Sequence, residues 1–455
     1  MYVCGSIPLQ SCVIVLSYIQ ISFIPSESEA ENVKIEQICQ TMPFGNGAGP
    51  CWSRGNSPII RVDSRVFVTH SKVHPERKPL NNTTLEIWEK SDGGEWRMVY
   101  EEPETFQREP CPIAYLGNGV LAVTVNVLAE FHAPDEATED TDCIPMLYLF
   151  DISGPLRKTS SIRLKWNRDD YIFWEHSYRG FAYDKVRGNL FLNNIEYGDE
   201  QFCYTLLDCK LATIRSGKLR FPARSCYHNI AMKDGETYLF AVRDIKEPNA
   251  AWRDYKRAVT GRQWDYDFRQ IFLNYCADIE TGDFEPSLLF CDRDATCGWT
   301  FPLDCCYDPN GDMLFMVSVQ NVAQPFMRER FFPGLAPESA LELYRFSKGK
   351  LISQTQLAVS ADTELSTGYS GFFHTAANGE VYAIWSKDAY VPGDALPKGT
   401  YLSRLSAPDE PPVRLMEECG CTFGSKVRLG AAPSDTVDLY WAREEKEIMH
   451  GEFEL

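Results

Sequence analysis

The stretch GYSGFFHTAANGEVYAIWS, residues 368–386, decides the fold of this chain. An apolar segment leads into an Asn-Gly turn and a second apolar segment follows, which is the pattern of a β-hairpin. Tyr369 stands near the start of the first segment. Whether this tyrosine belongs to a core or to a site depends on whether the hairpin recurs, and on where the first residues of each copy gather.

The same turn-and-strand unit recurs along the whole chain. Its copies read DSRVFVTHS (63–71), GNGVLAVTVN (117–126), RGNLFLNNI (187–195), DGETYLFAV (234–242), NGDMLFMVSV (310–319), NGEVYAIWS (378–386) and SDTVDLYWA (434–442). An apolar segment precedes each copy, and in most cases two further short strands follow it. A unit of four short strands repeated every ~45–75 residues is typical of a β-propeller blade.

The repeat predicts an all-β fold, a seven-bladed β-propeller, with six blades as the alternative. The last unit, residues 421–455, holds only about three strands. We expect the strand VKIEQICQT (33–41) to supply the missing one, which would close the ring and remove both free sheet edges. Residues 31–455 would then form one domain. Inserts at 135–142, 247–265 and 324–337 fall between second and third strands, and we expect them to rim one face of the disc.

The first 30 residues are expected to be a leader outside the propeller. Their apolar run VIVLSYIQISFI (13–24) is shorter than the ~20 residues that a membrane span needs. A secretory signal has a basic segment at its start, but the first basic residue here is Lys34. A degenerate signal and a disordered leader both remain open, and so do an exported and a cytoplasmic location.

Composition excludes several classes of partner. The net charge of −19 argues against binding of nucleic acids and of anionic membrane surfaces. The 16 cysteines include no C-x-x-C pair with partner histidines, so we expect no metal and no other cofactor. Cys111, Cys226, Cys305 and Cys421 lie early in inner strands, where cysteine acts as a small buried hydrophobe. We expect a monomer.

The candidate site lies where the innermost strands begin, because these positions from all blades converge on one mouth of the central channel. Arginines there can bind carboxylates or sulfates through paired hydrogen bonds, and aromatic rings can stack on sugars. The expected partner is therefore an acidic carbohydrate. The alternative is that the arginines pair with neighbouring acids around the rim. The candidates are Arg54, Arg108, Glu175, His176, Arg179, Arg224, Tyr227, His228, Trp299, Asp304, Tyr369, Lys426 and Arg428.

Three stretches resemble the sialidase superfamily of propellers and the related propeller polysaccharide lyases. KSDGGEW (90–96) resembles a shortened Asp-box turn, and GYSGFF resembles the stretch that carries the sialidase nucleophile, which implies that role for Tyr369. In SCYHNIAMKDGETYLFAVR, Tyr227 stands 16 residues before Arg243, a spacing similar to that of a tyrosine and an arginine in the lyases. The sialidase glutamate is missing near Tyr227, and Gly55 stands where a lyase histidine would be.

Three functions remain open at this point. A sialidase-like glycoside hydrolase would use Tyr369 as nucleophile, Glu175 or Asp304 as carboxylate, and Arg54, Arg108 and Arg243 on the substrate. A lyase of uronate-containing glycans would use Tyr227, His228, His176 and Arg243. A non-catalytic propeller would bind a glycan or a protein at the same face. Both enzyme readings predict one shared cavity. For Tyr369 we expect a hydroxyl directed into it, the alternative being a ring packed between blades five and six.

Overall fold

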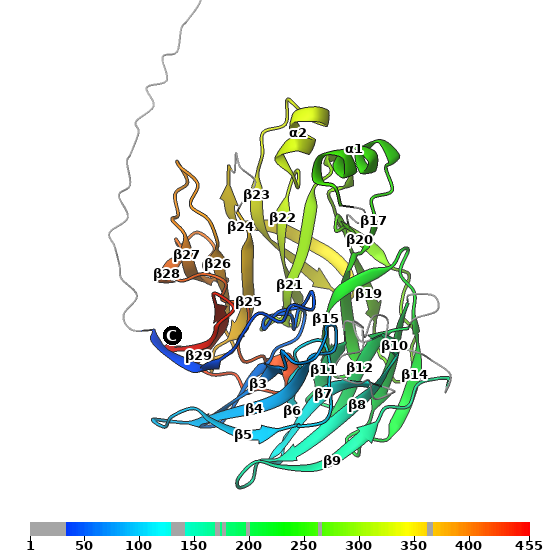
Figure 1. Cartoon of the computed structure of the whole chain (residues 1–455), viewed down its shortest axis with the longest axis vertical. Helices are drawn as coiled ribbons and strands as arrows, with labels where there is room; N and C mark the ends of the chain where they lie inside the picture. The colour runs from blue at the N-terminus through cyan, green and yellow to red at the C-terminus, as the bar shows by residue number, and fades with distance from the viewer. Residues whose placement is uncertain are drawn as a thin grey trace, which may run out of the picture.

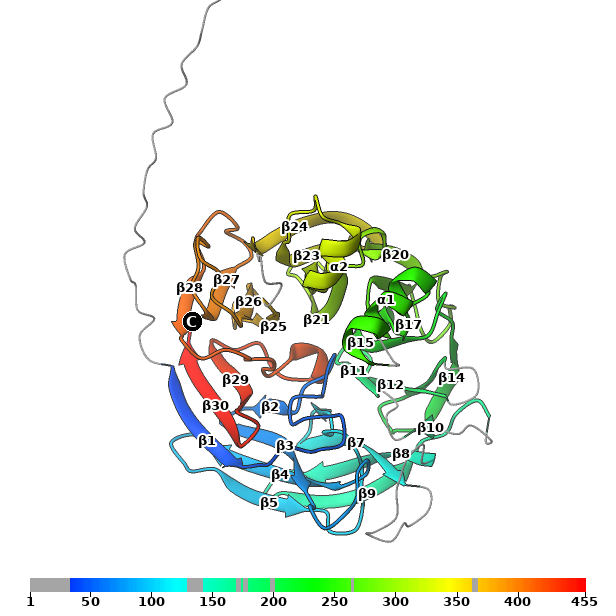
Figure 2. The ribbon, with the colours of Figure 1, turned by 45° about the horizontal axis from the view of Figure 1, so that its top comes forward.

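The computed structural model describes residues 33–128, 142–168, 173–174, 179–196, 201–262, 266–361 and 367–455. The strands in these ranges form seven antiparallel sheets arranged as blades around a central axis and one small two-stranded ribbon, so the prediction of a seven-bladed all-β propeller is confirmed (Figures 1 and 2). The expected leader, residues 1–30, lies outside the described residues.

Blades one to three are built from consecutive strands. Blade one contains β2 (Ile59–Val62), β3 (Arg65–Val73), β4 (Thr83–Ser91) and β5 (Arg97–Glu101). Blade two contains β6 (Ile113–Tyr115), β7 (Val120–Leu128), β8 (Asp142–Asp151), β9 (Arg157–Arg163) and the short β10 (Phe173–Trp174). Blade three contains β11 (Gly180–Asp184), β12 (Asn189–Ile195), β13 (Phe202–Leu207) and β14 (Thr213–Leu219).

Blades four to six repeat this order. Blade four contains β15 (Ser225–Lys233), β16 (Glu236–Arg243), β19 (Gln270–Cys276) and β20 (Leu288–Asp292), with a small ribbon of β17 (Ile245–Lys246) and β18 (Tyr266–Asp267). Blade five contains β21 (Trp299–Tyr307), β22 (Met313–Gln320), β23 (Ser339–Ser347) and β24 (Lys350–Ser360). Blade six contains β25 (Tyr369–Thr375), β26 (Val381–Lys387), β27 (Gly399–Arg404) and β28 (Val413–Met416).

Blade seven joins segments from far apart in the sequence. It contains β29 (Thr436–Arg443), β30 (Glu447–Glu454) and β1 (Lys34–Gln40), and a bridge from Phe423 to Tyr440 adds the innermost segment. β1 runs antiparallel to β30, with Lys34 opposite Glu452 (Figure 2). The predicted closure of the ring by the N-terminal strand is therefore confirmed, and it pairs the outer edge of β30.

The hydrophobic core lies between neighbouring blades. Between blades four and five, for example, the rings of Phe240 and Phe315 stack with centroids 4.0 Å apart. The cysteines that the structure describes are free thiols, and Cys111, Cys226, Cys305 and Cys421 are buried, as the sequence predicts.

Two of the three predicted inserts form helices on one face of the disc. α1 (Ala250–Thr260) lies between β16 and β19, and α2 (Pro325–Phe331) between β22 and β23. The helices lie side by side in both views, and the rings of Trp252 and Phe332 are 5.6 Å apart (Figures 1 and 2). Almost all of the 135–142 insert falls outside the described residues. Within the described part of the chain, no helix is long and apolar enough to cross a membrane.

Candidate functional site

The middle of the channel is closed by a buried cluster of charges. The carboxylate of Asp304, on β21, lies 2.8 Å from the Lys426 ammonium and 2.9 Å from the Arg428 guanidinium. Arg428 also donates to the carbonyls of Gly55, at 2.7 Å, and Ile230, at 3.1 Å. Burial alone would raise the pKa of Asp304, but Lys426 and Arg428 lower it below the usual value. We call Asp304, Lys426 and Arg428 the channel plug.

Four arginines of the predicted set are held by protein groups. Arg179 donates to the side chain of Gln107 and to the carbonyls of Glu109 and Pro110. The remaining three have the following partners: Arg224 pairs with Asp244 at 2.6 Å, Arg243 pairs with Asp267 and with Asp294 at 2.8 Å, and Arg108 donates to the carbonyl of Asn46 at 3.1 Å. The alternative, in which rim arginines pair with neighbouring acids, thus describes Arg224 and Arg243, whereas the bonds shown for Arg179 and Arg108 go to carbonyl and amide oxygens.

Tyr369 is a packed residue. Its side chain is 5% exposed and lies in the cluster between blades five and six, next to Trp385. Its hydroxyl lies 2.9 Å from the hydroxyl of Ser360 at the end of β24. The expectation of a hydroxyl directed into a channel-mouth cavity is therefore wrong, because the inter-blade core takes up the ring and Ser360 takes up the hydroxyl.

Of the two predicted site histidines, His176 and His228, the structure describes only His228. His228 is buried beside the Phe202 ring and packs under the backbone of Gly55. Burial lowers the pKa of His228 to about 3, so the ring is neutral at physiological pH. Glu175 and His176 lie outside the described residues.

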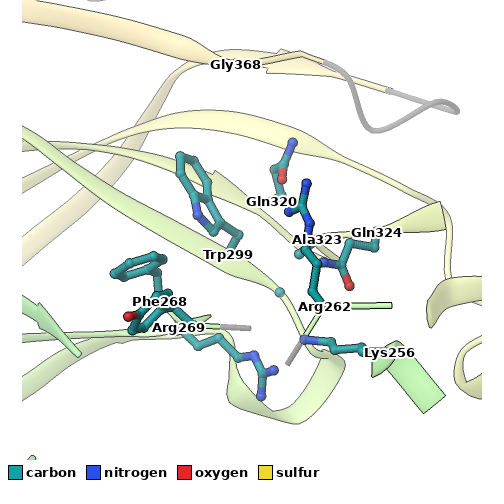
Figure 3. A pocket seen from close by; sticks show the side chains of 11 residues that line it. Lys256, Arg262, Phe268, Arg269, Trp299, Gln320, Ala323, Gln324 and Gly368 are labelled. Carbon is teal, nitrogen blue, oxygen red and sulfur yellow. The ribbon is translucent and has the colours of Figure 1, made fainter. Parts of the chain in front are cut away.

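An open cavity of about 450 Å³ lies at the strand-start mouth, between blades four and five and next to α1 (Figure 3). We call it the mouth recess. Trp299, predicted as a substrate-binding residue, lines it and stacks on Phe301 with ring centroids 5.4 Å apart. The recess is lined by Lys256, Arg262, Tyr266, Phe268, Arg269, Gly298, Trp299, Gln320, Ala323, Gln324 and Gly368.

The cations of the mouth recess differ in their partners. Lys256 lies 3.1 Å from Glu247, and Arg269 pairs with Glu247 and with Asp294. Among the residues that the structure describes, no ion pair engages Arg262, which is exposed at the end of α1. The recess therefore has a floor of neutralised pairs and one cation at its rim.

Tyr227 and Arg54 lie behind the aromatic side chains that line the mouth recess, which are Tyr266, Phe268 and Trp299. Tyr227 stands in a β-bulge of β15 with a left-handed backbone, φ +49°, a strained conformation that is found preferentially at functional sites. Its ring centroid is 4.9 Å from that of Phe301 and 5.8 Å from that of Phe268. The Arg54 guanidinium lies 4.9 Å from the centre of the same Phe301 ring. Tyr227, Arg54 and Trp299 therefore meet around Phe301.

Asp388 is a residue of this mouth that the sequence reasoning missed. It follows β26, and its backbone N–H donates to the carbonyl of Gly368 at 3.2 Å. A Cβ at Gly368, in the lining of the recess, would lie 2.8 Å from the Asp388 carboxylate. The carboxylate is accessible but largely surrounded by protein, which raises its pKa to about 6, while Arg54 and Lys398 oppose the rise. The sequence places the candidate acids before or early in inner strands, whereas Asp388 follows a second strand.

Comparison with known proteins shows the fold. No protein-family model and no curated protein matches the sequence. An ulvan lyase of polysaccharide lyase family PL25, bound to a GlcA(1-4)Rha3S saccharide, is similar in structure, with a TM-score of 0.54 at 10% identity over 92% of this chain and 95% of the lyase. A second ulvan lyase structure gives 0.51 at 9% identity, over 91% and 95% of the two chains.

A sialidase from Trypanosoma rangeli, in complex with the inhibitor DANA, has a TM-score of 0.43 at 8% identity, over 93% of this chain and 59% of the sialidase. The likeness to the two ulvan lyases agrees in fold with the sequence resemblance to propeller polysaccharide lyases. At such low identity, the likeness to the ulvan lyases shows a shared propeller architecture over nearly the whole of both chains.

Proposed function

We propose that the protein is a glycan-active propeller that binds an acidic polysaccharide at the mouth recess and cleaves it next to a uronate by β-elimination. One observation carries the proposal: Tyr227, in a strained bulge, and the cation Arg54 meet around Phe301, whose other neighbour is the recess tryptophan Trp299. The site therefore combines a phenol and a guanidinium around Phe301, next to the aromatic platform that Trp299 offers in the mouth recess.

These groups match the needs of an elimination reaction. The carbon next to a sugar carboxylate loses its proton only if a cation offsets the charge that develops on the carboxylate. Arg54 is the cation over Phe301, and Tyr227, on the same ring, is the group that would remove the proton. Trp299 offers a ring face for a sugar, and Arg262 offers a cation for a neighbouring sulfate or carboxylate at the rim.

Hydrolysis with Tyr369 as nucleophile has less support, because the Tyr369 hydroxyl meets Ser360 inside the inter-blade core. Elimination agrees better with the neighbours, since the ulvan lyase is similar over nearly its full length and its structure holds a glucuronate-containing saccharide. This agreement supports the class of ligand and does not identify the polymer.

The second candidate is glycan binding without cleavage. It is favoured by the ion pairs of Arg243 with Asp267 and Asp294, which occupy the arginine that the lyase resemblance assigns to the substrate. In that case the mouth recess would hold the saccharide, and Tyr227 would serve only as part of its wall.

One experiment separates these functions. The protein is incubated with glucuronate-containing and sulfated polysaccharides, and three signals are followed. Elimination produces a double bond conjugated to the carboxylate and hence ultraviolet absorbance, whereas hydrolysis produces reducing ends without it. Binding alone gives a calorimetric signal with neither product. We expect ultraviolet absorbance with a uronate polymer.

Trp299→Ala tests the place of binding. Loss of a stacking ring should weaken affinity about tenfold or more, since aromatic contacts contribute about 1 kcal/mol beyond buried area. Trp96→Ala is the matched control, because Trp96 is also half-buried but packs against His450 in blade seven. Equal affinity of both variants would move the site away from the mouth recess.

A further inference from the structure

We infer that Asp388 is the proton donor of this site, acting opposite Tyr227 with Arg54 between them. The inference rests on the proposed function and deepens it, because elimination needs an acid for the leaving oxygen as well as a base. Of the two carboxylates that the sequence predicts for this role, Asp304 is locked in the channel plug and Glu175 lies outside the described residues.

The position of Asp388 follows from two contacts. The carboxylate lies against Gly368, whose missing side chain leaves room for it at the edge of the mouth recess. Arg54 interacts electrostatically with both Asp388 and Tyr227, and its guanidinium lies over Phe301. The three groups therefore come from blade six, the segment before blade one, and blade four, and they face one mouth of the channel.

Asp388 also differs from the structural acids of the molecule. Among the residues that the structure describes, no ion pair or side-chain hydrogen bond engages its carboxylate, whereas nearby Asp394 pairs with Lys387. The charged and titratable groups that face Asp388 are Arg54, Lys398 and the Cys419 thiol. Burial raises the pKa of Asp388 to about 6 against the effect of both cations, so a useful fraction stays protonated near neutral pH.

The proposed step balances without any co-reactant. Tyr227, acting as its phenolate, takes the proton from the carbon next to the carboxylate and becomes a phenol, and the electron pair left behind forms the carbon–carbon double bond. The bond from the neighbouring carbon to the glycosidic oxygen breaks, and Asp388 gives its proton to that oxygen. The Tyr227 phenol then gives its proton to solvent, which restores the phenolate, while the Asp388 carboxylate regains a proton from solvent. Arg54 offsets the charge on the sugar carboxylate throughout.

Asp388→Asn tests the role with a glucuronate-containing polysaccharide as the probe. We expect kcat to fall about a hundredfold or more, as for loss of general acid catalysis, while affinity changes less than about threefold. The wild-type kcat should fall as the pH rises above about 6, because Asp388 then loses its proton, and this limb should vanish in the variant. A substrate with a nitrophenol leaving group should restore the rate of the variant, since its departure needs no proton.

Asp409→Asn is the control, because Asp409 is an exposed acid in an outer turn of the same blade. Asp388→Glu keeps a carboxylic acid at this position and should retain part of the activity. If this variant were as inactive as Asp388→Asn, the loss would come from misfolding rather than from the missing acid. Wild-type cleavage with an unimpaired Asp388→Asn variant would overturn the inference and leave the proposed function standing. Equal losses of binding and turnover, without leaving-group rescue, would also overturn it. Absence of both binding and cleavage in the wild type would overturn the proposed function itself.

Discussion

The middle of the channel and its strand-start mouth contain similar charged side chains in opposite situations. In the channel plug, Asp304 contacts two cations and Arg428 reaches carbonyls of two further segments. At the mouth, Asp388 forms no ion pair among the described residues and interacts with Arg54 and Lys398 only through longer-range electrostatics. Pairing lowers the pKa of Asp304, whereas desolvation by the surrounding protein, without a paired cation, raises the pKa of the accessible Asp388 carboxylate. An acid that is fully paired holds the blades together, and one that is left unpaired keeps a proton to exchange.

The largest expected effect comes from breaking the channel plug. Asp304→Ala leaves Lys426 and Arg428 buried without their counter-charge, and removing one partner of a buried pair costs about 3–5 kcal/mol. Urea unfolding should show a correspondingly lower free energy of unfolding.

The control for that variant is Arg404→Ala. Arg404 forms an exposed pair with Glu380 at 2.7 Å, and such solvent-screened pairs contribute little to stability. If Asp304→Ala and Arg404→Ala lowered the free energy of unfolding equally, the channel plug would be accessible to water. The plug would then not differ from the mouth in burial.

The pH dependence of stability tests whether the His228 ring is buried, like the channel plug, or accessible to solvent, like the mouth of the channel. Its folded pKa, about 3, lies below the unfolded value of about 6.5, so only the unfolded state takes up the proton in between. Its contribution to stability is complete above pH 6.5 and falls as the pH drops toward 3, by at most about 1.4 kcal/mol per pH unit.

Unfolding of the wild type and His228→Gln, followed between pH 7 and pH 4, should therefore show a shallower loss in the variant. His70 contributes in the same direction, because burial lowers its pKa to about 4, so a residual slope remains. If the free energy of unfolding depended on pH equally in both proteins, the His228 ring would be in contact with solvent, like the groups at the mouth.

The smallest expected effect concerns Tyr369. Tyr369→Phe removes one hydrogen bond, to Ser360, and should cost about 1 kcal/mol of stability without changing turnover. Ser360→Ala should give a similar loss, and the double variant should lose little more than either single one. Loss of turnover in a stable Tyr369→Phe variant would restore the nucleophile hypothesis.

The fold could be predicted from the sequence because its signal is local. Each blade is a set of neighbouring hairpins, and a turn such as Asn378-Gly379, with φ +87° at the glycine, can be recognised within a few residues. The closure by β1 could also be predicted, because the last unit lacks a strand and an unused strand stands before the first.

The site could be predicted only in part, because its chemistry depends on partners that are distant in sequence. Strand-start positions include Trp299, Tyr227 and Arg54, which the structure brings together around Phe301, and their role in a site stays a prediction. They could not show that Arg243 meets Asp294, or that an acid after a second strand, Asp388, reaches the mouth recess. Such pairings depend on how loops of different blades come together, and no local pattern encodes them.

The pairing of β1 with β30 has a consequence for how the protein assembles. Lys34 cannot meet Glu452 until the blades between them exist, so the ring closes by the most non-local contact in the molecule. The entropic cost is modest, because loop closure costs only about 0.6 kcal/mol for each doubling of length. The kinetic consequence is larger. Until β1 pairs with it, β30 has a free strand edge that can pair with another chain. Domain-swapped or aggregated products should therefore arise from open rings, and their yield should rise with protein concentration during refolding.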